Sequence, residues 1–306
     1  MRIIFSASQT KTQPWVDALR AEFPDAQVEE WHPGAAPADY AVVWRPPQQL
    51  FDEQPALKAI FNTGAGVDAL LDMKLPANVP LVRIDDGGMA VQMAEYVCHA
   101  LIRHFRELDC YEDDVRHGAW SFRKPRRRED FPVGIMGLGV LGRRVAQAVG
   151  HFEFPLRGWS RTPRQVDGMQ CFAGAEGFDA FLGGTRVLVC LLPLTPDTEN
   201  IMNRESLGKL MPGGYVINVA RGAHLAEEDL IALLDSGHLA GATLDVFRTE
   251  PLPEGHPFWT HPKITITPHT SARTLRDESV AQIAGKIRRF ERGEPIAGVV
   301  DRGRGY

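Results

Sequence analysis

The feature that most constrains this chain is the repeated alternation of short apolar runs with stretches of helical periodicity. Apolar runs of strand length fall at residues 3–5, 41–44, 59–61, 81–84, 133–136, 156–159, 187–192, 215–219, 242–246 and 264–266. Helical patterns lie between or after them, at residues 89–115, 140–149, 226–236 and 275–292. This density of strand–helix alternation predicts an α/β fold in which helices wrap parallel sheets.

The alternation occurs twice, once on each side of the helical pattern at residues 89–115, and 306 residues are enough for two domains. We therefore expect two doubly wound, Rossmann-like domains. No strand follows the last helical pattern, so that helix is expected to pack back on the first domain and make it discontinuous. The expected domains are residues 1–97 with 275–306, and residues 98–274.

Composition excludes several classes of protein. A net charge of -5 argues against a nucleic-acid or anionic-membrane binder. The N-terminal apolar run is too short for a signal peptide, and no run approaches the roughly 18 apolar residues of a membrane span. The four cysteines form no CxxC pair, so we expect no metal or redox motif and a cytoplasmic protein.

One basic run, Arg123-Lys124-Pro125-Arg126-Arg127-Arg128, stands apart from the acidic remainder of the chain. It is expected to be a solvated connector leading into the strand at residue 133. The alternative interpretation is an anion-binding patch.

A glycine fingerprint, Gly137-Leu138-Gly139-Val140-Leu141-Gly142, follows the apolar strand at residues 133–136 and opens a helical pattern. In that position the first glycine makes a tight turn, the second lets the backbone approach a pyrophosphate, and the third allows close packing of helix on strand. The helix N-terminus supplies free N–H groups to the phosphates. The run therefore predicts a dinucleotide site.

The residues after the next strand indicate which dinucleotide binds. A site for NAD places Asp or Glu about 20 residues after the glycines, where it bonds the ribose 2′-hydroxyl. Here that position is Ser160, followed by Arg161 and, three residues on, Arg164. Arginine pairs with a 2′-phosphate that a carboxylate would repel, so the sequence favours NADP(H).

Three further residues are candidates for catalysis. Arg221, Glu250 and His269 each follow the carboxyl end of a predicted strand, where parallel α/β sheets place their ligands. Each alone is weak evidence. Together with the dinucleotide fingerprint, these three residues supply what the reduction of a 2-oxo acid requires. They offer a cation for the substrate carboxylate and an acid–base pair.

With these motifs in order, the chain resembles the D-2-hydroxyacid dehydrogenase family, and within it the bacterial glyoxylate/hydroxypyruvate reductase A group. The resemblance spans nearly the whole chain. Besides the glycine fingerprint, it rests on the stretches at residues 64–68, 92–96, 159–162, 192–196, 218–222, 244–247, 250–253, 267–269 and 300–306.

The resemblance implies a role for each matching position. Arg221 would hold the substrate carboxylate, His269 would protonate the carbonyl oxygen, and Glu250 would orient His269 and favour its charged form. The remaining cofactor contacts would come from Leu192, Pro193, Ala220 and Asp245, the last of these near the nicotinamide. The substrate contacts would come from Trp44, Arg45 and the backbone of Ala65, Gly66 and Val67.

The implied activity is NADPH-dependent reduction of glyoxylate and hydroxypyruvate to glycolate and D-glycerate by a homodimer. Residues 1–97 and 275–306 would bind the substrate, and residues 98–274 would bind NADP. Two alternatives stay open: another D-2-hydroxyacid dehydrogenase activity, and a cofactor-sensing binding protein without catalysis. Glu250 argues against formate oxidation, because the resemblance implies a Gln at this position in relatives with that activity.

Overall fold

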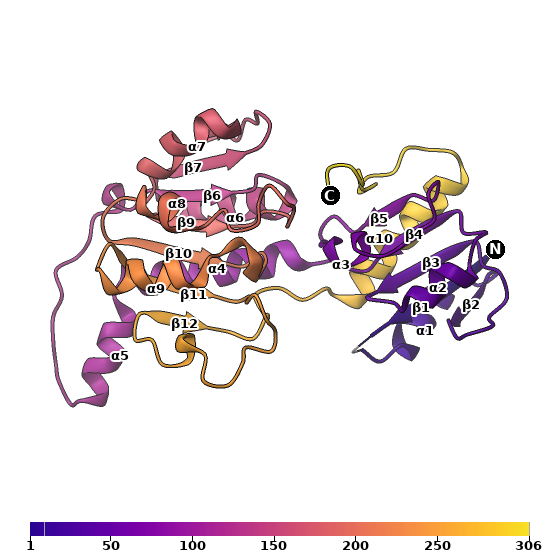
Figure 1. The fold of residues 1–306 in the computed structure, drawn as a ribbon, viewed down its shortest axis with the longest axis horizontal. Coiled ribbons are helices and arrows are strands. Elements are labelled where there is room, and N and C mark those ends of the chain that lie inside the picture. Colours follow the sequence, from indigo (N-terminus) through magenta and orange to yellow (C-terminus); the bar gives the residue numbers. More distant parts are fainter. Residues whose placement is uncertain (9, 306) are drawn as a thin grey trace. The chain divides into compact units, whose positions relative to one another are not determined.

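The computed structural model describes residues 1–8 and 10–305, so Tyr306, the last residue of the C-terminal stretch noted above, lies outside them. The chain separates into two compact units, Met1–Met89 with Arg273–Tyr306, and Ala90–Ala272. Each is a parallel sheet wrapped by helices (Figure 1). The predicted fold class is confirmed, including the discontinuous first unit.

The first unit contains a five-stranded sheet in the order β2-β1-β3-β4-β5 with every pair parallel. Helix α10 (Arg276–Glu291) returns from the C-terminal part of the chain to pack beside α1 (Gln13–Glu22), and is the yellow helix among indigo elements in Figure 1. The other elements are β1 (Arg2–Ala7), β2 (Gln27–Glu30), β3 (Tyr40–Trp44), α2 (Gln48–Glu53), β4 (Ala59–Asn62), α3 (Asp68–Leu71) and β5 (Leu81–Arg83).

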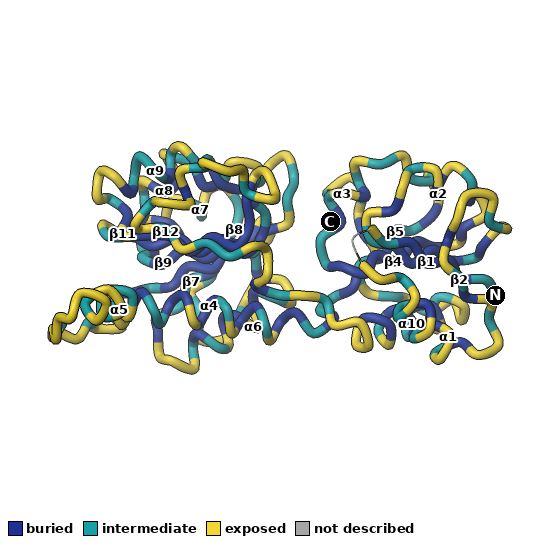
Figure 2. The backbone as a smooth tube through the Cα atoms, turned by 90° about the horizontal axis from the view of Figure 1, so that it is seen from below, coloured by how far each residue is buried: buried dark blue, intermediate teal, exposed yellow. Residues whose placement is uncertain are grey.

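The second unit contains a seven-stranded parallel sheet in the order β12-β11-β10-β9-β6-β7-β8. Its strands are β6 (Val133–Met136), β7 (Leu156–Ser160), β8 (Met169–Ala173), β9 (Val187–Cys190), β10 (Gly214–Asn218), β11 (Leu239–Leu244) and β12 (Ile264–Ile266). Its helices are α4 (Met89–Phe105), α5 (Leu108–Arg116), α6 (Val140–His151), α7 (Gly174–Gly183), α8 (Arg204–Gly208) and α9 (Glu227–Asp235). Figure 2 shows its central strands buried and most of the exposed chain in the surrounding loops and helices.

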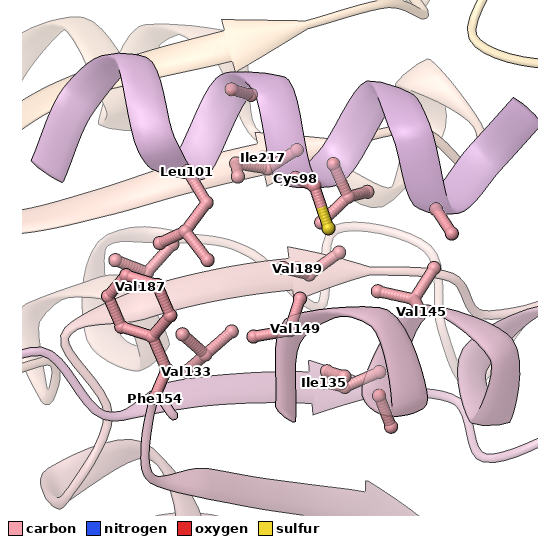
Figure 3. Packing of buried hydrophobic residues seen from close by; sticks show 14 of the residues in the cluster. Cys98, Leu101, Val133, Ile135, Val145, Val149, Phe154, Val187, Val189 and Ile217 are labelled. Carbon is pink, nitrogen blue, oxygen red and sulfur yellow. The ribbon is translucent and has the colours of Figure 1, made fainter. Parts of the chain in front are cut away.

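The central strands of this sheet are apolar on both faces because both faces are covered. In β9, Val187 and Val189 pack toward α4 and α6, whereas Leu188 and Cys190 pack toward α7, α8 and α9. Figure 3 shows the first of these cores, in which Leu101 of α4 lies over the strands. Burial on both sides explains why the central strands read as continuous apolar runs.

One predicted element is wrong in extent. The helix expected over residues 89–115 is two helices, because Glu107 adopts the left-handed conformation with φ 54° and ends the regular backbone between α4 and α5. Helix α5 has no buried residue, so it does not share the core that α4 packs against. Among the described residues, no helix has the length and apolar character of a membrane span.

Candidate active site

The loops at the carboxyl edge of the seven-stranded sheet carry most of the candidate residues. The glycine loop follows β6, the arginine loop follows β7, and Arg221, Glu250 and His269 follow β10, β11 and β12. In a parallel sheet these ends lie at one edge, which is the usual ligand side. The sheet thus gathers side chains that are more than 100 residues apart in the sequence.

The glycine loop has the geometry that a dinucleotide requires. Gly137 has φ 101°, a left-handed conformation that non-glycine residues rarely adopt, and a Cβ there would lie 2.7 Å from the Leu191 carbonyl oxygen. A Cβ on Gly142 would lie 1.9 Å from the Gly137 carbonyl oxygen, so glycine lets α6 approach the loop. Gly139 begins α6 with no side-chain cap and nothing within 4 Å of its Cβ position.

These observations fit a bound pyrophosphate. The first turn of α6 leaves backbone N–H groups without partners, and the space beside Gly139 is open to a phosphate oxygen. Val140 is 49% exposed and Leu141 is half-buried, and both belong to the first turn of α6.

The loop after β7 presents cations beside a buried serine. Ser160 is buried and its hydroxyl donates to the Thr162 carbonyl oxygen at 2.8 Å. Arg161 and Arg164 are both exposed. No carboxylate stands at the strand end, so the loop is suited to a 2′-phosphate.

Glu250 and His269 form the central pair of the site. The His269 Nδ1 atom lies 2.8 Å from Glu250 Oε2, and the other carboxylate oxygen accepts a hydrogen bond from the Phe247 amide at 3.0 Å. The His269 side chain is 41% exposed. Since Glu250 engages Nδ1, the Nε2 atom is the nitrogen left to meet a substrate.

Asp245 fixes the loop that carries His269. Its carboxylate is fully buried and accepts from the Thr267 hydroxyl at 2.6 Å and from the amides of Thr270 and Ser271 at 2.8 Å. Its own carbonyl oxygen accepts from the His269 amide at 2.8 Å. These bonds fix the loop in which His269 adopts φ 53°.

Arg221 lies on a loop that packs closely on the one carrying Glu250. A Cβ on Gly222 would lie 1.8 Å from the Phe247 carbonyl carbon, so only glycine permits this approach. The Arg221 side chain is half-buried and one guanidinium nitrogen donates to the Ala220 carbonyl oxygen at 2.8 Å.

His224 was not singled out in the sequence, yet it joins two loops of the site. It is fully buried, its Nδ1 atom lies 3.2 Å from the Arg221 amide, and its Nε2 atom lies 3.2 Å from the Pro193 carbonyl oxygen. Because a carbonyl can only accept, Nε2 carries a proton, and Nδ1 lies 3.1 Å from the Arg221 carbonyl oxygen as well. Leu192, beside Pro193, is buried.

The candidate substrate residues of the first unit lie close to one another. Trp44 ends β3 and its ring packs on the turn after β4, since a Cβ on Gly64 would lie 2.3 Å from the ring. Arg45 has φ 46° and its guanidinium carbon lies 5.8 Å from the Trp44 ring centroid.

Asn62, also missed in the sequence, organises the turn that contains Ala65, Gly66 and Val67. Its amide nitrogen donates to the carbonyl oxygens of Gly64 at 3.0 Å and Gly66 at 2.7 Å. The buried Asn62 side chain thus fixes the backbone of this turn. The only signal in the sequence was its place at the end of β4, directly before a glycine-containing turn.

A parallel α/β unit with an open glycine loop and a Glu–His pair on the same sheet edge defines a dinucleotide-dependent dehydrogenase. The family described as D-isomer specific 2-hydroxyacid dehydrogenase, NAD binding domain, matches residues 98–271. A glyoxylate/hydroxypyruvate reductase A of Serratia proteamaculans is 49% identical over 313 residues, covering 100% of both chains. The chain belongs to the D-2-hydroxyacid dehydrogenase family.

Solved structures agree with this assignment. A D-isomer specific 2-hydroxyacid dehydrogenase of Xanthobacter autotrophicus in complex with NADPH has a TM-score of 0.95 and 41% identity, and covers 100% of this chain and 99% of its own. An NADPH-dependent glyoxylate/hydroxypyruvate reductase of Sinorhizobium meliloti in complex with NADP has a TM-score of 0.93 and 37% identity, with the same coverage. The family resemblance inferred from the sequence is confirmed.

Proposed function

We propose that this protein reduces glyoxylate and hydroxypyruvate to glycolate and D-glycerate with NADPH. The observation that carries the proposal is the 2.8 Å hydrogen bond between His269 and Glu250, on the sheet edge that bears the glycine loop. Relatives that cover the whole chain at 44–49% identity carry the name glyoxylate/hydroxypyruvate reductase A.

Arg221, Glu250 and His269 are the proposed catalytic residues. NADPH, when bound, supplies the hydride. Arg221 pairs with the substrate carboxylate and so orients the 2-oxo group. His269 donates its Nε2 proton to the carbonyl oxygen, and Glu250 holds the opposite nitrogen, which fixes the orientation of the ring.

The second unit is proposed to bind NADP(H), within residues 98–274. Gly137, Gly139, Val140, Leu141 and Gly142 surround the pyrophosphate. The 2′-phosphate is proposed to contact Ser160, Arg161 and Arg164, and the nicotinamide end Leu192, Pro193, Ala220 and Asp245.

The first unit is proposed to bind the substrate, within residues 1–97 and 275–306. The amides of Ala65, Gly66 and Val67 face the substrate carboxylate because Asn62 holds the neighbouring carbonyls. Trp44 and Arg45 border the same turn.

A cytoplasmic homodimer is the proposed working form. Trp120 and Phe122, in the segment after α5, are 90% and 89% exposed, which is unusual for large aromatic side chains of a monomer. Light scattering coupled to size-exclusion chromatography tests the dimer, and replacement of Trp120 and Phe122 by Ser is expected to weaken it.

Steady-state assays test the activity. The purified protein is assayed with NADPH and NADH against glyoxylate, hydroxypyruvate, pyruvate and bulkier 2-oxo acids. We expect the highest kcat/KM with NADPH as the cofactor and with glyoxylate or hydroxypyruvate as the substrate. A tenfold advantage for NADH with every substrate would contradict the roles of Arg161 and Arg164, and cofactor binding without turnover would favour a sensing protein.

His269→Ala tests the mechanism separately. General acid catalysis contributes roughly 10²–10⁴-fold, so kcat should fall by about that factor while NADPH still binds. Wild-type turnover in this variant would remove His269 from the proposed role.

A further inference from the structure

The second unit has a cavity of about 420 Å³ at the edge of the sheet opposite to the edge that carries the glycine loop. It lies at the amino ends of strands, with Phe131 just before β6 and Arg186 directly before β9. Residues 124–127, from the basic run that the proposed reaction leaves unused, line the same cavity. The cavity therefore cannot be the cofactor site.

The lining is rich in cations. The cavity is lined by Lys124, Arg126, Arg127 and Arg186, and Asp130 is the one carboxylate among the described residues that line it. Glu107 pairs with Arg126 at 2.9 Å, and Glu129 with Arg127 at 3.4 Å. Among the residues that the structure describes, Lys124 and Arg186 form no ion pair, so the cavity keeps positive charge that a bound anion would neutralise.

Two of the guanidinium groups are already held in place. The carbons at the centres of the Arg126 and Arg186 guanidinium groups lie 5.4 Å and 5.3 Å from the centroid of the Phe131 ring. Arg186 donates to the Pro212 carbonyl oxygen at 2.6 Å, and Arg126 donates to the His104 carbonyl oxygen at 3.1 Å. Neutral carbonyls fix the geometry without removing the charge, so an anion would meet a pre-organised site.

A buried imidazole completes the cavity. His104, in the last turn of α4, is 8% exposed and stacks on Tyr215 with centroids 4.0 Å apart. Its Nε2 atom is buried and has no hydrogen-bond partner among the residues described in the structure. A buried polar atom without a partner costs free energy, and a bound group that hydrogen-bonds to it would remove that cost.

We propose that this cavity binds a small multivalent phosphate anion, with Lys124, Arg126, Arg127 and Arg186 around its charge and His104 bonded to one of its oxygens. Its volume accommodates a pyrophosphate-sized group. This site would lie at the amino ends of the strands, whereas the proposed reaction takes place at their carboxyl ends. The anion and NADP(H) would therefore bind to one chain at the same time.

Calorimetry with pyrophosphate tests the proposal. Pyrophosphate is titrated into the full-length protein saturated with NADP⁺, at an ionic strength held constant with KCl. Saturation with NADP⁺ occupies the phosphate subsites of the proposed active site. We expect one pyrophosphate per chain.

Two variants probe the site from different sides. Lys124→Gln with Arg127→Gln removes exposed charges without touching the core, and should weaken binding at least about tenfold. His104→Phe keeps the ring against Tyr215 but removes the nitrogen, and should weaken it several-fold. The matched control is Arg204→Gln, which removes an exposed charge of the same unit, on α8, and should leave the affinity unchanged.

Three results would overturn the proposal. One is an absence of pyrophosphate binding. Another is binding that disappears when NADP⁺ is present. The third is an affinity in both site variants that equals the affinity of the Arg204→Gln control.

Discussion

Protonation of His104 should make the second unit sensitive to acid. Burial, with the charges of Arg126 and Arg186, lowers the pKa of His104 from 6.5 to about 4. The unfolded chain therefore binds a proton that the folded chain does not, in the window between pH 6.5 and about 4. The free energy of unfolding is therefore highest above this window, and it decreases as the pH falls through it. Between pH 7 and pH 5 the expected loss is about 2 kcal/mol.

Urea unfolding followed by circular dichroism measures this loss, at pH 7 and pH 5 in buffers without phosphate. His104→Phe removes the titrating ring, so its free energy of unfolding should fall by about 2 kcal/mol less than that of the wild type over this interval. Phe105→Leu, at the next position of α4, is the control, because neither side chain titrates. Equal losses in the wild type and in His104→Phe would refute the reasoning.

Three substitutions test the proposed active site. Glu250→Gln gives His269 a neutral partner and should lower kcat at least about tenfold with little change in the KM for NADPH; an unchanged kcat would exclude the pair from catalysis. Asn62→Ala releases two turn carbonyls and should raise the KM for the 2-oxo acid about tenfold, while thermal stability and the KM for NADPH report any general damage. Gly142→Ala places a methyl group 1.9 Å from the Gly137 carbonyl oxygen, and should lower the free energy of unfolding by about 2 kcal/mol, measured by urea titration; full stability would mean that the loop moves freely.

The sequence predicted the central strands and one edge strand of each sheet, β5 and β12, and missed the other edge strand of each sheet. Strands β6, β9 and β10 are buried on both faces, so their apolar runs identify them. Strands β2 and β8 lie at sheet edges, and β2 has only Val28 buried. The break at Glu107 was missed as well, because no Gly or Pro marks it.

For the candidate site, the sequence revealed the residues that a local pattern marks and missed those whose role depends on distant contacts. Arg221, Glu250 and His269 could be selected because each follows a strand, which is visible in the local pattern. His224 and Asn62 could not, because their importance lies in contacts with backbone atoms, and those of His224 reach as far as Pro193. A polar residue that becomes buried against a distant carbonyl has no local pattern to reveal it.

The return of α10 to the first unit affects the order in which a growing chain can fold. A ribosome makes residues 1–89 before the second unit, yet the first unit is complete only when α10 has emerged as well. The second unit, Ala90–Ala272, is contiguous and can close while the first still lacks the helix that packs beside α1. During translation the early strands therefore carry an uncovered apolar face, and the part made later finishes first.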